Sequence, residues 1–188
     1  MKKIISLFKR DYESTRQVIN EVVSGAEWVL AGEGVATEKI DGTCCMVKDG
    51  QLYKRYDAKK GKPPPDGWIA AQEPDEITGH WPGWLLVGDG PEDKWHREGW
   101  INLTNGFKDM PKDWTYELVG PKVQGNPYRH NQHFLIPHGL KTFTANPPRN
   151  FDKLRLWFED HSIEGIVWHH SDGRMVKIKR RDFGFKWP

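Results

Sequence analysis

Apolar and polar residues alternate along much of the chain, which is the pattern of half-buried β-strands. The alternation runs through residues 35–47 and resumes at 51–56, and Lys48-Asp49-Gly50 between the two runs predicts a β-hairpin turn. A second hairpin is expected near the end of the chain, where residues 164–168 and 174–179 flank Ser171-Asp172-Gly173. We expect further strands at 28–30, 114–119 and 134–136.

Helical spacing of apolar residues occurs in two stretches. Val18, Ile19, Val22 and Val23 predict a short amphipathic helix over residues 14–23, and a second helix is expected near residues 150–160. Residues 57–113 are rich in Pro and Gly and predict long loops that carry short strands, without a linker to a second domain. Mostly antiparallel strands with few helices indicate an α+β fold.

The composition is that of one globular domain. A chain of 188 residues is long enough to enclose a core and too short for two large lobes, so we expect a single domain over residues 1–188. Hydrophobic residues make up 37% of the chain and the mean hydropathy is −0.76, so the surface is strongly polar. Most of the ten Trp are expected in the core.

The sequence favours a cytoplasmic location without membrane contact. No apolar run approaches the roughly 18 residues that cross a bilayer, and charged residues interrupt the N-terminal segment before a signal-peptide core. Cys44 and Cys45 are adjacent in a predicted strand and should face opposite ways, so a disulfide between them is unfavourable. Two reduced cysteines fit a reducing compartment.

Positive charge is local, because the net charge is only +2 while basic residues gather at 54–62 and 177–186. Local clustering of this kind suits phosphate recognition. For the first cluster, an ordinary solvated edge is an equal alternative.

Lys39-Ile40-Asp41-Gly42 carries the first candidate chemistry. In a strand, Lys39 and Asp41 would share a face, and Gly42 would let backbone or ligand come close. A lysine in such a pocket can act as a covalent nucleophile when neighbouring cations lower its pKa. The alternative is a surface strand that ends in an Asp-Gly turn, with both side chains solvated.

Two distant segments add cations and carboxylates. In the last hairpin, Val176 and Ile178 alternate with Lys177 and Lys179, so both ammonium groups can face one cleft and bind phosphate, although lysines on a strand edge also deter aggregation. Glu164 begins the partner strand. A second carboxylate interrupts the apolar strand 114–119, and a guanidinium follows the first motif; these residues are Glu117 and Arg55.

The histidines do not form a spaced zinc motif. Adjacent His169 and His170 should diverge in a strand, and with His161 they are expected to be structural. The histidines at positions 130, 133 and 138 are expected on loop surface, with phosphate contact as the alternative.

In this order, Lys39-Ile40-Asp41-Gly42, Glu117 in its strand, Glu164-Gly165-Ile166-Val167 and Lys177-Ile178-Lys179 resemble the motifs of covalent nucleotidyltransferases, the polynucleotide ligases and capping enzymes. The segment from Gly120-Pro121 to Tyr128 and the closing residues 164–188 are most similar to small ATP-dependent 5′-3′ RNA ligases. The likeness extends over nearly the whole chain. It implies a nucleotidyltransferase domain of mainly antiparallel sheets with a few flanking helices that enclose a nucleotide cleft.

The resemblance also implies the reaction. Lys39 would attack the α-phosphorus of ATP, hold AMP as a phosphoramidate, and pass it to an RNA 5′-phosphate, which a 3′-hydroxyl then joins. Lys177 and Lys179 would bind the α-phosphate, while Glu117 would hold the ribose.

Further roles follow from the same resemblance. Arg55 would contact the nucleotide or the RNA end, with Glu38 beside the adenine and Ile40 at the nucleotide. Asp41, Glu117 and Glu164 would orient hydrated Mg²⁺, for which Mn²⁺ can substitute. The adenine needs a flat apolar neighbour, and Phe134 and Ile136 share a face of one strand.

Ligases of this superfamily usually carry a further β-barrel or helical module after the last lysine motif, and here the sequence stops at Pro188. We therefore expect the RNA surface to come from the middle loops and basic clusters or from an accessory partner. Base stacking by Trp68, Trp81, Trp84 or Trp95 is the alternative to their burial in the core. Contact with RNA is the alternative to a structural role for the histidines at positions 161, 169 and 170. A DNA ligase, a capping-type transferase and an adenylated end-binding protein without turnover remain alternatives.

Overall fold

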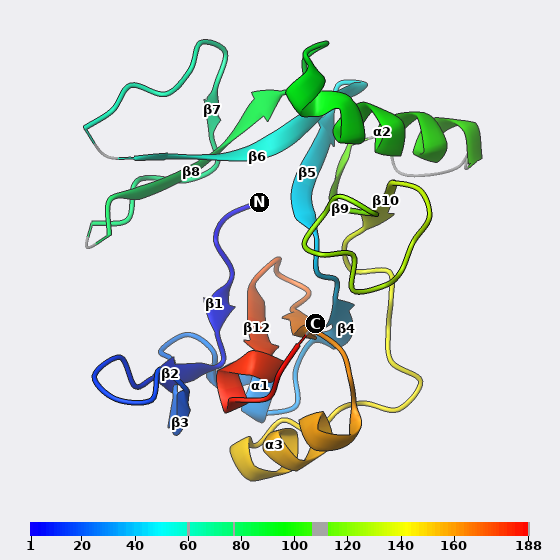
Figure 1. Ribbon diagram of the computed structural model, residues 1–188. Helices are drawn as coiled ribbons and strands as arrows, with labels where there is room; N and C mark the ends of the chain where they lie inside the picture. The colour runs from blue at the N-terminus through cyan, green and yellow to red at the C-terminus, as the bar shows by residue number, and fades with distance from the viewer. Residues whose placement is uncertain (60, 77, 107–112, 188) are drawn as a thin grey trace. The chain divides into compact units, whose positions relative to one another are not determined.

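The computed structural model describes residues 1–59, 61–76, 78–106 and 113–187 (Figure 1). The chain divides into two compact units, each described here by itself. The first unit contains Met1–Lys3 and Asp41–His138, and the second contains Ile4–Ile40 and Gly139–Pro188. The chain therefore passes between the units three times, directly after Lys3, Ile40 and His138. One nucleotidyltransferase domain over residues 1–188 stays a prediction.

The first unit is built on an antiparallel six-stranded sheet with the order β10-β9-β5-β6-β8-β7. Its strands are β5 (Thr43–Lys48), β6 (Gln51–Lys59), β7 (Ile69–Ala70), β8 (His80–Leu86), β9 (Trp114–Val119) and β10 (Phe134–Pro137). The 3-10 turn η1 (Pro91–Asp93) leads into helix α2 (Lys94–Gly106), which lies against β9 and β10. Leu103 of α2 packs into a core with Val47, Tyr116, Leu118 and Leu135 of the sheet.

The second unit contains a four-stranded sheet with the order β1-β12-β11-β4. Its strands are β1 (Ile5–Ser6), β4 (Val35–Lys39), β11 (Gly165–His169) and β12 (Met175–Lys179); β1 runs parallel to β12, and the other pairs are antiparallel. A separate ribbon pairs β2 (Phe8–Arg10) with β3 (Val18–Val22). The helices are α1 (Glu27–Leu30), α3 (Phe151–Asp160) and the 3-10 turn η2 (Arg180–Phe183).

Helix α3 covers the inner face of this sheet. It begins where the Asn150 side chain accepts a hydrogen bond from the Lys153 backbone N–H at 2.9 Å, as an N-cap does. Leu154 and Phe158 are fully buried, and they belong to one core with the alternate sheet residues Ile166, Trp168, Val176 and Ile178. The residues that alternate with these core positions point to the opposite face of β4, β11 and β12, and three of them are lysines.

The α+β class is confirmed, and so are both hairpins. Asp49 and Gly50 both have positive φ, as a two-residue hairpin turn requires. Helix α3 also lies where it was predicted. No helix among the described residues is both long and apolar enough to cross a membrane.

Three local predictions are wrong. Residues 14–23 contain strand β3 instead of a helix, because Val18 and Val22 pair with Arg10 and Phe8 of β2 and β-branched residues suit a strand. Residues 28–30 belong to helix α1, since a short apolar run does not distinguish a strand from a helix. Helix α2 was missed because the Pro and Gly content of residues 57–113 predicted long loops. A side chain at Gly99 of this helix would come within 2.6 Å of Leu118 Cδ1.

The tryptophans also differ from expectation. Trp28, Trp84 and Trp168 lie in the buried core, whereas the other seven of the ten are half-buried or exposed. Trp68 and Trp81 pack edge to face with ring centroids 4.7 Å apart, and their indole N–H groups donate to the carbonyls of Tyr56 and Gln72. Burial excludes Trp84 from base stacking in this structure.

Arg149 holds the turn after α1 in place. Its guanidinium donates to the carbonyl oxygens of Val29 at 3.1 Å and Gly34 at 2.9 Å, and also to that of Glu33. We expect Arg149→Ala to lower the free energy of unfolding by about 2 kcal/mol, because it leaves carbonyl groups without their donor. Urea denaturation measures this, with Arg155→Ala on the exposed side of α3 as the matched control. Equal midpoints for the two variants would contradict the prediction.

Candidate active site

The outer face of the second unit's sheet carries three lysines in register. Gly165 of β11 lies between Lys39 of β4 and Lys179 of β12, and Val167 lies beside Lys177 in the next cross-strand row. Residues two apart in a strand share a face, so all three lysines project from the side opposite the α3 core. The strands thus bring residues 39, 177 and 179 together although they are far apart in the sequence.

Glu164 joins two of these lysines. Its Oε2 lies 2.6 Å from Nζ of Lys39 and its Oε1 lies 2.7 Å from Nζ of Lys179. The Glu164 side chain is only 4% exposed, so the two ion pairs form where water screens them little. Lys39 Nζ also lies 3.4 Å from the carbonyl oxygen of Ile40, which is buried.

Lys177 is the cation whose pKa is displaced. Burial, together with the nearby ammonium groups of Lys179 and Lys39, lowers the pKa of Lys177 to about 8. Three clustered ammonium groups around one carboxylate leave an excess of positive charge on this face. Such a face is suited to bind an anion such as phosphate.

Gly165 permits this close arrangement. A Cβ on Gly165 would lie 2.3 Å from the Ile178 carbonyl oxygen and 3.0 Å from the Lys179 Cα. Any side chain there would force β11 and β12 apart, so the glycine of Glu164-Gly165-Ile166-Val167 has a steric reason. Glu38 alternates with Lys39, and its carboxylate pairs with Lys141 at 2.6 Å, so it is directed away from the lysine face.

The first unit also has a polar face, opposite the core that α2 covers. Cys44 of β5 and Ile136 of β10 lie directly across from Glu117 of β9. Alternation places Phe134 on the same face, and Arg55 of β6 belongs to it through the β5–β6 register. The structure therefore brings together four of the predicted site residues: Arg55, Glu117, Phe134 and Ile136.

Arg55 and Phe134 both have defined partners on this face. The Arg55 guanidinium lies 5.0 Å above the Trp84 ring, donates to the Met1 carbonyl oxygen at 3.0 Å and pairs with Asp57 at 3.1 Å. Phe134 meets the His130 ring edge to face at 5.6 Å. Lys54, the neighbour of Arg55, faces the other side and pairs with Asp93, so it does not present its charge to solvent as the basic-cluster interpretation required.

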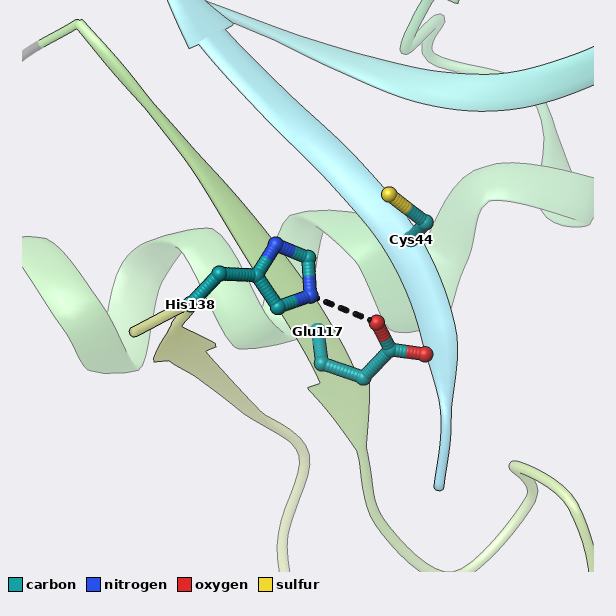
Figure 2. Close-up of side chains that lie close together, drawn as sticks. All are labelled: Cys44, Glu117 and His138. Carbon is teal, nitrogen blue, oxygen red and sulfur yellow. Dashed lines mark hydrogen bonds and ion pairs between the residues drawn. The ribbon is translucent and has the colours of Figure 1, made fainter. Parts of the chain in front are cut away.

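Glu117 is buried and bonded to a histidine that the sequence placed on loop surface. Its Oε2 lies 2.7 Å from Nε2 of His138 (Figure 2). The Nδ1 of the same ring lies 3.0 Å from the Thr115 hydroxyl. His133 is also not on the surface, because it is 2% exposed and stacks on Trp95 at 4.5 Å. The sequence signal for His138 was its spacing of two from Ile136, which continues the face of β10 beyond the strand end.

Gly42 has the role expected for it, but the strand around it is interrupted. A Cβ on Gly42 would lie 2.2 Å from the Leu118 carbonyl oxygen and 2.8 Å from Glu117 Cγ, so only glycine allows this approach. Strand β4 ends at Lys39 and β5 starts at Thr43, so Lys39 and Asp41 do not share the face of one strand. The Asp41 backbone N–H instead donates to the Tyr128 hydroxyl at 2.7 Å.

The remaining cysteine and histidine predictions fit the structure. Cys44 and Cys45 form no disulfide, and only Cys45 is fully buried. His169 contacts the Thr37 hydroxyl at 3.0 Å, His170 contacts Glu33 at 2.7 Å, and His161 stacks on Trp157 at 3.8 Å. These three histidines have structural partners.

Comparison with known proteins gives one consistent family. The family model described as RNA ligase 1 matches residues 98–188. RNA ligase 1 of Danio rerio is 30% identical over 252 aligned positions, which cover 96% of this chain and 77% of the relative. The proteins of the same name from Mus musculus and Pongo abelii are each 31% identical, with 96% of this chain and 76% and 77% of the relatives covered. Because the likeness extends over nearly the whole chain and most of each relative, this chain belongs to the RNA ligase 1 family.

Proposed function

We propose that the protein is an ATP-dependent RNA ligase that joins a 5′-phosphate to a 3′-hydroxyl end through a lysyl-AMP intermediate. The observation that supports this most directly is the cluster of Lys39, Lys177 and Lys179 around Glu164, in a chain of the RNA ligase 1 family. A nucleophilic amine beside further cations is what attack on a phosphate ester needs.

In the first step, the unprotonated Nζ of Lys39 attacks the α-phosphorus of ATP. A phosphorus–nitrogen bond forms, the bond to the bridging oxygen breaks, and pyrophosphate leaves. Lys177 and Lys179 stabilise the negative charge that builds on the α-phosphate oxygens, because preorganised cations cost little reorganisation at the moment of reaction. In the resting structure Glu164 contacts the Lys39 amine, so this ion pair must open as the amine loses its proton.

In the later steps, a 5′-phosphate oxygen of RNA attacks the AMP phosphorus and Lys39 leaves as the free amine. The 3′-hydroxyl then attacks the activated 5′-phosphorus, AMP leaves, and a phosphodiester forms. We assign Glu117 to the ribose, Arg55 to the nucleotide or the RNA end, and Phe134 and Ile136 to the adenine, because these four share one face of the first unit. Glu38 and Ile40 remain proposed neighbours of the nucleotide, and for the Glu38 side chain this requires that its ion pair with Lys141 opens and that the carboxylate turns toward the bound nucleotide.

Asp41, Glu117 and Glu164 are the proposed ligands of hydrated Mg²⁺. The buried Glu164 carboxylate, whose oxygens both face amines, is the hard donor type that Mg²⁺ takes through its water shell. When bound, the ion would neutralise charge on the phosphate oxygens.

The test is a denaturing gel of the protein with α-labelled ATP and Mg²⁺, followed by a chase with 5′-phosphorylated RNA. We expect a labelled protein band, transfer of the label to RNA, and then joined RNA. Labelled GTP and 5′-phosphorylated DNA, run in parallel, separate the capping-type and DNA-ligase alternatives. RNA with a 5′-hydroxyl is the control and should accept no label. Labelling without joining on any RNA would favour the adenylated end-binding protein or the need for an accessory partner, and absence of labelling would overturn the proposal.

A further inference from the structure

Three potential metal ligands meet on the polar face of the first unit. They are the Cys44 Sγ, a carboxylate oxygen of Glu117 and a ring nitrogen of His138, and these atoms all lie within 4.8 Å of one another (Figure 2). Nothing in the proposed ligase chemistry uses Cys44 or His138. The proposed ligase function therefore does not account for the convergence of these three side chains.

The sheet positions these side chains. Cys44 and Glu117 form a cross-strand pair between β5 and β9. Ile136 lies across from Glu117 on the other side, and two residues later the His138 backbone N–H donates to the Thr115 carbonyl oxygen at 3.0 Å. Neighbouring strands hold their side chains more rigidly than loops do, so the three donors are preorganised.

The Glu117–His138 contact can exchange a proton for a metal ion. With Nε2 of His138 2.7 Å from the carboxylate and Nδ1 3.0 Å from the Thr115 hydroxyl, the ring is held at both nitrogens. An ion between Nε2 and the carboxylate would leave the Thr115 hydrogen bond intact, and such outer bonds orient metal-binding histidines. The side chains of Glu117 and His138 are only 10% and 20% exposed, which favours tight ligation over competition by water.

The donor types select the ion. One thiolate, one imidazole and one carboxylate form a mixed set that suits Zn²⁺, whereas Mg²⁺ prefers oxygen alone. Three protein ligands leave a fourth tetrahedral position for water or an exogenous group. Binding would release the proton of the Cys44 thiol, because the thiolate is the form that binds the ion.

We propose that Cys44, Glu117 and His138 form a zinc-type divalent metal site in the first unit. Metal binding here does not depend on the proposed function. The two proposals share Glu117. While its carboxylate binds the ion, it is not available to hold the ribose of ATP.

The test is titration of the full, metal-free chain with Co²⁺, followed by displacement with Zn²⁺. We expect one Co²⁺ per chain, with a sulfur-to-cobalt charge-transfer band that Zn²⁺ abolishes. Cys44→Ser should remove the band. His138→Gln should weaken Zn²⁺ binding about 100-fold or more in competition with a chromophoric chelator, because loss of even an outer partner costs 10–100-fold. Thr115→Val should weaken it about 10-fold, with rescue by Thr115→Ser.

Matched controls are Cys45→Ala on the buried face of β5 and His80→Gln at an exposed position of β8, and both should retain the band. If Cys44→Ser fails to fold, protection of Cys44 from alkylation by Zn²⁺ in the unmodified chain gives the same answer by mass spectrometry. Absence of the band, or equal affinity in the His138 variant, would overturn the site. ATP labelling by the metal-free chain with Mg²⁺ reports separately on the proposed function.

Discussion

Lys39→Ala should abolish transfer of label from α-labelled ATP to the protein, with a loss on the order of 10³-fold or more, because no other group replaces a covalent nucleophile. The fold should persist. Lys39 ends strand β4 with a partly exposed side chain, and Glu164 keeps its second ion pair with Lys179 when Lys39 is removed. Denaturing gels measure labelling, and circular dichroism with urea denaturation measures folding.

Lys141→Ala is the matched control for Lys39→Ala. Lys141 also pairs with a carboxylate of the second unit, Glu38, but its side chain is 58% exposed and it lies away from the lysine face. We expect this variant to be labelled at nearly the normal rate. Retained labelling in a folded Lys39→Ala protein would remove Lys39 as the nucleophile, and mass spectrometry of the labelled peptide would then identify the residue used.

Glu164→Gln should reduce the rate of labelling by about 10²–10³-fold, equivalent to about 2–4 kcal/mol of barrier if Glu164 acts as a preorganised charge. The substitution preserves volume but removes the one negative charge shared by Lys39 and Lys179. Three ammonium groups would then face each other without the carboxylate that pairs with two of them, and the proposed Mg²⁺ ligand would be lost as well. Single-turnover labelling at several Mg²⁺ concentrations measures the effect.

Raised Mg²⁺ should rescue Glu164→Gln in part, which distinguishes loss of an ion ligand from loss of folding. Glu159→Gln on the exposed side of α3 is the matched control and should leave the rate unchanged. Lys179→Met removes the other side of the same ion pair and should be impaired on a similar scale through lost phosphate stabilisation. A wild-type labelling rate in Glu164→Gln would show that Glu164 does not belong to the site that binds the reacting phosphate.

Local patterns accounted for much of the fold. The apolar strand pattern at residues 114–119, the alternation in the closing hairpin and the helical spacing near residues 150–160 predicted β9, β11, β12 and α3. The errors fell where a pattern was ambiguous. In β3 a helical spacing of β-branched residues was overridden by pairing with β2. Helix α2 lies in a segment whose Pro and Gly content predicted loops, and its Gly99 permits close packing on Leu118.

The candidate site shows the same division. The order of the motifs predicted Lys39, Glu164 and Lys179 as site residues. The register of β4, β11 and β12 places their charged atoms in contact. The expected strand through Lys39 and Asp41 did not form, because β4 ends before Ile40 and the chain enters the other unit at Asp41. His138 had no sequence motif to mark it, since its partner Glu117 is 21 residues away.

The sequence by itself determined the class of fold, the family motifs and the face on which each lysine of β12 lies, because strand periodicity is a local property of the chain. Only the tertiary structure decided which carboxylate pairs with each cation. It also buries Lys177 beside two other ammonium groups, which lowers the pKa of Lys177, and it brings Cys44, Glu117 and His138 together. Those outcomes depend on strand register, which is set by the packing of whole sheets against α2 and α3 and is not encoded in any short segment.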